Sequence, residues 1–98
     1  MKINLTEKAQ EELKKVLKSK DNGKFVRIYI AGFGWGGPSF GLALDELKEG
    51  DSKVEAGEFT FILEEHLVEA FKGFIIDYTN NWLRRGFSVT PDREGSNC

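Results

Sequence analysis

The chain has 98 residues, enough for one domain and too few for two of ordinary size. Its net charge of -2, with 40% hydrophobic and 31% charged residues, excludes a disordered composition and argues against nucleic acid as a partner. No apolar run is long enough to span a bilayer, and the first residues lack the apolar centre of a signal peptide. We therefore expect a cytoplasmic protein without a membrane partner.

The first residues predict an edge strand over residues 1–5 and then an amphipathic helix. Thr6 is placed to cap this helix, which ends near Ser19. A turn over residues 20–24 precedes residues 25–31, whose alternating β-branched and aromatic side chains predict a strand. The apolar positions at helical spacing are Leu5, Ala9, Leu13, Val16 and Leu17.

Residues 31–44, AGFGWGGPSFGLAL, contain the glycine-rich segment around which we expect the chain to be organised. Glycine and proline disfavour regular structure, so we predict a loop that lets backbone or a ligand come close. The centre of this candidate site is Gly34, Trp35, Gly36 and Gly37. Two other readings stay open: a long glycine-rich hairpin connection, and a Trp35 side chain that covers the loop as part of the core.

The second half alternates strands with one short helix. Residues 64–72 return to helical periodicity, and Gly73 is placed to end this helix. Residues 92–98 have no apolar pattern, which predicts a flexible tail after a single domain of residues 1–91. We expect an α+β fold, mainly β, with curled mixed or antiparallel sheets in a pseudobarrel and two helices. The remaining predicted strands cover residues 39–47, 53–56, 58–63, 74–78 and 86–90.

Few residues suggest chemistry. His66, the only histidine, is expected on a helix surface with Glu69 or Leu63 as its nearest neighbours. No serine, histidine and acid arrangement is present, so we predict that the protein is not an enzyme. Cys98 is the only cysteine, which excludes an internal disulfide and a thiolate-only metal site within one chain. From the residues alone, Cys98 is an idle terminal thiol.

The order of segments resembles the HesB/IscA-type (A-type) iron-sulfur cluster carriers. The opening matches through LTEKAQEELKKVL, VRIYIA, the glycine loop and LALDE, and the closing run matches through FTFILEEHL, IIDY and GFSVTPD. The similarity covers essentially the whole chain. It implies a HesB-like fold, a role in iron-sulfur cluster assembly or carriage, a dimeric or larger state, and assembly or acceptor proteins as partners.

The resemblance also implies ligands. Family members typically bind iron or an iron-sulfur cluster through three cysteines, one in the glycine loop and two near the C-terminus as Cys-x-Cys. Trp35 stands at the loop position and offers no thiolate, whereas Cys98 matches the first cysteine of the terminal pair and is the predicted metal ligand. We expect the natural tail to continue past Cys98, its end here being a truncation or a selenocysteine codon read as a stop.

A second function stays open beside the carrier. The chain is then a metal-free HesB-like binding or structural module. Trp35 and the glycine loop would contact a protein partner, since an exposed indole is a frequent contact residue in interfaces.

Overall fold

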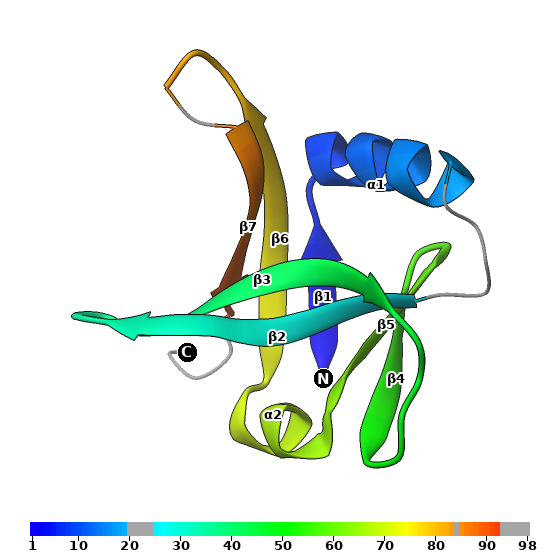
Figure 1. The fold of residues 1–98 in the computed structure, drawn as a ribbon, viewed down its shortest axis with the longest axis vertical. Coiled ribbons are helices and arrows are strands. Elements are labelled where there is room, and N and C mark those ends of the chain that lie inside the picture. The colour runs from blue at the N-terminus through cyan, green and yellow to red at the C-terminus, as the bar shows by residue number, and fades with distance from the viewer. Residues whose placement is uncertain (20–24, 84, 93–98) are drawn as a thin grey trace.

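The computed structural model describes residues 1–19, 25–83 and 85–92, which form one curled sheet and two helices (Figure 1). The fold is mostly β, as predicted. In chain order the elements are β1 (Lys2–Leu5), α1 (Glu7–Ser19), β2 (Phe25–Gly34), β3 (Gly37–Asp45), β4 (Asp51–Ala56), β5 (Phe59–Glu64), α2 (Glu65–Ala70), β6 (Gly73–Asn80) and β7 (Arg85–Pro91).

The seven strands form a mixed sheet in the order β1-β6-β7-β3-β2-β5-β4. Strand pairs β1–β6 and β2–β5 are parallel, and the other neighbouring pairs are antiparallel. The two outermost strands, β1 and β4, approach each other, so the sheet is nearly closed. The predicted curled, mixed sheet is confirmed.

Helix α1 packs against the sheet through its apolar face. The backbone N–H of Ala9 donates to Thr6 Oγ1 at 3.2 Å, and the Thr6 hydroxyl donates to Asp77 Oδ1 at 2.7 Å. Thr6 therefore caps the helix and also ties its start to β6. Ala9 and Leu13 are buried beneath the helix. The predicted cap and amphipathic helix are confirmed.

The core fills the curl of the sheet. Phe40, Phe71 and Phe74 meet at its centre, with ring centroids 4.9 to 5.4 Å apart and mostly edge-to-face contacts. Figure 1 shows α2 at the end of the sheet where β5 and β6 join it. The largest fully buried side chains are Phe61, Phe74, Ile28, Ile62, Leu63, Ile76 and Val26.

The predicted glycine loop is wrong in its extent. Strand β2 continues to Gly34 and β3 begins at Gly37, so only Trp35 and Gly36 form the turn. Strand pairing with Phe33–Pro38 and Gly34–Gly37 as partners overrides the weak strand propensity of glycine. Of the two open readings, the hairpin connection is the correct one, and it is short.

The predicted role of Gly73 as a helix end is also wrong. Helix α2 ends at Ala70, and Gly73 is the first residue of β6. A Cβ atom on Gly73 would collide with the carbonyl oxygen of Lys2 in the paired strand β1. Gly73 therefore serves the close approach of two strands.

Two predicted segments lie outside the described residues: the turn over residues 20–24 and most of the tail, residues 93–98. Asp92, the first residue of the predicted tail, is described. Its backbone N–H donates to the carbonyl oxygen of Gly73 at 2.8 Å, and its Oδ2 accepts from Asn4 Nδ2 at 3.2 Å.

A buried arginine ties three strands together. Arg27 of β2 donates from Nε to Asp45 Oδ2 at 2.7 Å and from a terminal nitrogen to Asp51 Oδ1 at 2.9 Å. The side chains of Arg27 and Asp51 are only 12% and 3% exposed. Asp51 also accepts from the backbone N–H of Lys48 at 2.7 Å. The hydrogen bond between the two side chains raises the pKa of Arg27 and lowers the pKa of Asp51, so both groups stay charged.

Replacing Asp51 should destabilise the fold because it leaves the Arg27 charge with one carboxylate partner, Asp45, in a poorly solvated site. We expect Asp51→Asn to lower the free energy of unfolding by about 2 to 3 kcal/mol, measured by urea unfolding. Glu55→Gln, at an exposed position of the same strand, is the matched control and should change the free energy of unfolding by less than about 0.5 kcal/mol. Equal losses in the two variants would contradict this role.

The same carboxylates predict how stability depends on pH. Hydrogen bonds from the backbone N–H of Glu46, from Arg27 and from Lys48 lower the pKa of Asp45 from 3.8 to about 2. A lowered folded-state pKa adds stability that is fully present above the unfolded value and disappears as pH falls through the folded value. Urea unfolding should therefore show a loss between about pH 4 and pH 2 that is smaller in Asp45→Asn. A gain of stability over this range would refute the prediction.

Candidate functional site

The β2–β3 hairpin extends beyond the rest of the sheet. Among the described strands, β5 pairs with β2 only at Val26 and Arg27, and β7 pairs with β3 only at Phe40. Residues 31–39, which we call the hairpin arm, therefore pair with one another and have no third strand within the described chain. Figure 1 shows the arm extending from the left of the sheet.

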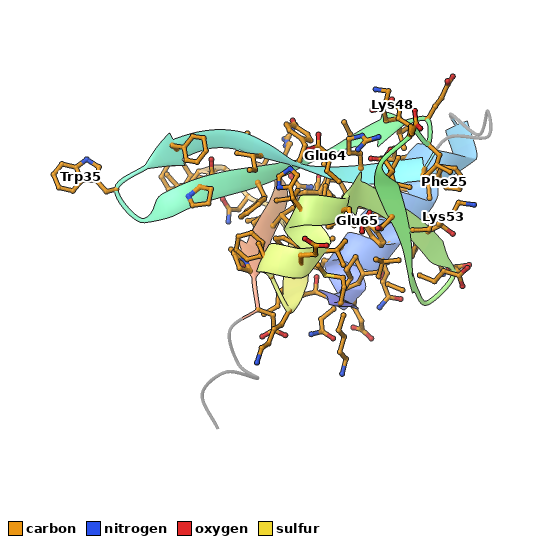
Figure 2. All side chains as sticks on the ribbon, turned by 90° about the horizontal axis from the view of Figure 1, so that it is seen from below. Phe25, Trp35, Lys48, Lys53, Glu64 and Glu65 are labelled. Carbon is orange, nitrogen blue, oxygen red and sulfur yellow. The ribbon has the colours of Figure 1, made fainter. Side chains whose placement is uncertain are left out.

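The tip of the arm holds the predicted site residues Gly34, Trp35, Gly36 and Gly37. The structure brings these four together, and Trp35 is completely exposed, at 108% of its reference area. Figure 2 shows its indole at the far end of the arm, pointing away from the other strands. The reading in which Trp35 covers the loop as a core side chain is wrong, because the arm carries it beyond the core.

The glycines at the tip leave its backbone open. A Cβ atom added to Gly34 or Gly36 would meet no atom within 4 Å, and neither residue has a positive φ. Gly37 differs because its φ of 109° is disfavoured for other residues. Packing within the described residues therefore gives no reason for Gly34 and Gly36, whereas the approach of a ligand or partner would.

A register shift keeps an apolar stripe on one face of the arm. The shift lies between Ile30, which pairs with Phe40, and Gly32, which pairs with Ser39. It places Phe33 on the same face as the buried Phe40. Exposure along this face rises from the core outward: Val26 is 2% exposed, Ile28 1%, Ile30 36% and Phe33 81%.

The other predicted ligand, Cys98, lies outside the described residues. The pairing of β7 with β3 nevertheless indicates in which direction the chain runs before Cys98. Strand β7 is antiparallel to β3 and meets it at Val89–Phe40, so it runs toward the end of β3 that carries the tip. The tip lies five residues from Phe40, or ~17 Å along a strand. Strand β7 stays paired with β6 as far as Pro91, and Asp92 is bonded to Gly73 and Asn4. Cys98 follows Asp92 by six residues, which span at most ~20 Å.

His66 lies on the surface, as expected, but its neighbour is a different residue. Its Nε2 lies 2.6 Å from Glu64 Oε1, and both side chains are 64% exposed. The expectation of Glu69 or Leu63 is wrong because Glu64 precedes the helix with an extended backbone, at φ -61° and ψ 145°. Helical spacing does not apply to its side chain.

The structure also has a cleft that the sequence did not predict. A hollow of about 460 Å³ lies between the β3–β4 turn and the start of α2, and a second of about 180 Å³ lies between α2 and Ile28, Tyr29 and Ile30 of β2. The first, which we call the acidic cleft, has five carboxylates against one arginine and one lysine. The only sequence signal was the number of acidic residues near both turns. The cleft carboxylates are Asp45, Glu49, Asp51, Glu64 and Glu65.

Within residues 1–19, 25–83 and 85–92, no three His, Cys, Asp or Glu side chains are grouped to hold a metal ion. In the same part of the chain, no helix has the length and apolar character needed to cross a bilayer.

Known proteins resemble this chain over almost its whole length, although no family model matches it. The iron-sulfur cluster insertion protein ErpA of Aeromonas salmonicida is 29% identical over 98 residues, which cover 98% of this chain and 84% of ErpA. Among solved structures, Escherichia coli SufA, involved in biosynthesis of iron-sulfur clusters, has a TM-score of 0.71 at 18% identity and covers 98% of this chain and 85% of its own.

A structure of IscA with a [2Fe-2S] cluster gives a TM-score of 0.68 at 22% identity, covering 93% of this chain and 83% of IscA. The solved structures establish the fold, and the alignment to ErpA extends the likeness to the sequence. Together they agree with the order of segments in the chain. The comparisons confirm the resemblance to the HesB/IscA-type (A-type) iron-sulfur cluster carriers that the order of segments indicates.

Proposed function

We propose that this protein accepts iron or an iron-sulfur cluster and passes it to acceptor proteins, with Cys98 as the protein's thiolate ligand beside the tip of the hairpin arm. The relatives support the class of cargo, because ErpA is a cluster insertion protein and the IscA structure holds a [2Fe-2S] cluster. The cluster is cargo here, so the protein is a carrier and not an enzyme.

The observation that carries the proposal is the direction of β7. It runs toward the tip-bearing end of β3. In this proposal the six residues after Asp92, at most ~20 Å of extended chain, bring Cys98 to the tip at Gly34 to Gly37. The open backbone at Gly34 and Gly36 gives space for an inorganic cluster next to the thiolate. Residues 1–91 act in this proposal as the domain, and residues 92–98 as the tail that carries the ligand.

Trp35 stands where family members typically have a cysteine, and this loss of a thiolate determines how many chains are needed to bind a cluster. The chain has one cysteine, whereas a [2Fe-2S] cluster takes four thiolates. Two chains supply two, so the proposal includes a homodimer with one Cys98 from each. An acceptor protein or a small thiol such as glutathione fills the other two positions. A reduced thiol of this kind persists in the cytoplasm, where we place the protein.

The first test is anaerobic reconstitution with iron, sulfide and glutathione. The wild-type protein should gain the visible absorption of a thiolate-bound cluster, and Cys98→Ser should lose it. A colourless wild type, or equal colour in the variant, would refute ligation by Cys98.

A gain-of-ligand variant makes the same test positive. Trp35→Cys adds a thiolate at the tip and should raise cluster occupancy at a fixed protein concentration. Lys53→Cys is the matched control, because it adds an exposed thiol on β4, which Figure 2 shows at the opposite end of the molecule from Trp35. An equal rise in both variants would mean that any surface thiol suffices, and the tip would have no special role.

The exposure of Trp35 favours a second candidate function, a metal-free binding module whose tip contacts a protein partner. In this case a partner that purifies with the protein should be lost in Trp35→Ala. Trp82→Ala is the matched control, since Trp82 is also highly exposed, at 89%, in the connection between β6 and β7. Retention of the partner by both variants would exclude the tip as the contact.

A further inference from the structure

We propose that the outer edge of β2 and the acidic cleft together form a docking site for an extended, basic segment of another protein. The segment would add as a strand beside β2 and place a lysine or arginine in the cleft. This inference goes beyond the proposed function, because the site uses neither Cys98 nor Trp35 and needs no metal.

The first observation is an unused strand edge. Strand β5 runs parallel to β2 and pairs with it at Val26 and Arg27, after which β5 leads into α2. From Tyr29 to Gly34, β2 keeps β3 on one side, and no described strand pairs with it on the other. Backbone N–H and C=O groups along such an edge accept an added strand, and the hydrogen bonds so formed are independent of sequence.

The second observation is that the side chains beside this edge are apolar and exposed on both faces. Ile30 and Phe33 lie on the core-side face, at 36% and 81% exposure. Tyr29, at 39%, lies on the other face, where its ring covers Gly41 of β3. An added strand with alternating apolar side chains would contact both faces, because cross-strand neighbours share a face.

The third observation is the charge at the start of the edge. The smaller hollow is lined by Ile28, Tyr29 and Ile30 of β2, by Glu64 at the end of β5, and by His66 and Leu67 of α2. Arg27, Glu64 and His66 line both this hollow and the acidic cleft, so the two adjoin each other. Figure 2 shows Glu64 and Glu65 on the side of the molecule that faces this edge.

Charge complementarity selects the occupant. In the acidic cleft the two cations Arg27 and Lys48 are paired with Asp45 and Asp51. The excess negative charge therefore comes from Glu49, Glu64 and Glu65, with His66 beside Glu64. A strand that ends in lysine or arginine is attracted to this cleft, whereas one that ends in glutamate is repelled. A second copy of this chain has a net charge of -2, so its overall charge does not attract it to the acidic cleft.

The experiment uses a defined peptide and the metal-free protein. The probe is acetyl-KTVTVTK-amide, and its charge-reversed partner is acetyl-ETVTVTE-amide. We expect the lysine peptide to shift the backbone amide NMR signals of residues 29–34, and the glutamate peptide to bind at least about tenfold more weakly. The Cys98→Ser variant should bind the same, which separates this test from the proposed carrier function.

A charge swap tests the cleft itself. Glu64→Lys/Glu65→Lys should reverse the preference so that the glutamate peptide binds more tightly. Glu11→Lys/Glu55→Lys makes the same change of net charge at exposed positions on α1 and β4, and should keep the preference of the wild type.

Four results would overturn the proposal. They are equal binding of the two peptides, amide shifts outside residues 29–34 and the cleft, an unchanged preference in Glu64→Lys/Glu65→Lys, and no shift at peptide concentrations of about 1 mM, where weak specific binding is detectable. A second copy of this chain is the other possible occupant of the edge. Sedimentation without peptide would detect a dimer, and hydrogen exchange would show whether the dimer protects the amides of residues 29–34. Such protection would assign the edge to a second copy and overturn the proposal.

Discussion

The hydrogen bonds that join the β2–β3 hairpin to the sheet end well before the hairpin does. They stop at Arg27 on the β5 side and at Phe40 on the β7 side. Every candidate functional feature follows from this early end. The tip residues are exposed because no strand covers them, and the edge of β2 is open because β5 has turned into α2.

A two-stranded arm is only marginally stable in water, so its root must be held firmly. Arg27 supplies this hold, since its bonds to Asp45 and Asp51 connect β2, the end of β3 and the start of β4. Phe40 supplies it on the other face by packing against Phe71 and Phe74. The arm therefore extends from a rigid base, which suits a surface that must present its tip in a fixed direction.

The sequence predicted most elements because local signals and tertiary packing agree there. Thr6 and the periodic apolar residues define α1, and Gly57 marks the turn of the β4–β5 hairpin. The prediction failed where propensity and pairing disagree: glycine disfavours a strand, yet Gly32 and Gly34 have strand partners. Exposure of Trp35 could not be predicted, because it depends on where the neighbouring strands end.

The candidate site was predictable in part. Residues 34–37 were identified from composition, but the role of Cys98 came from the family resemblance, since a lone cysteine has no spacing to interpret. The acidic cleft was missed because its carboxylates come from two distant turns, around Lys48 and Glu64, that only the folded sheet brings together. The role of Asp45 was missed for the same reason, because its partner Arg27 lies 18 residues away in the chain.

The proposed docking edge and the tip belong to the same arm, and this connects binding with transfer. A strand added along β2 from Tyr29 to Gly34 spans ~17 Å and ends beside Trp35. If its basic residue lies in the acidic cleft, its other end lies at the tip, where we propose that Cys98 holds its cargo. An acceptor bound in this way is positioned before any ligand exchange begins. Under the same proposal, the indole at position 35 supplies no thiolate, so the cargo would be held less tightly and given away more readily.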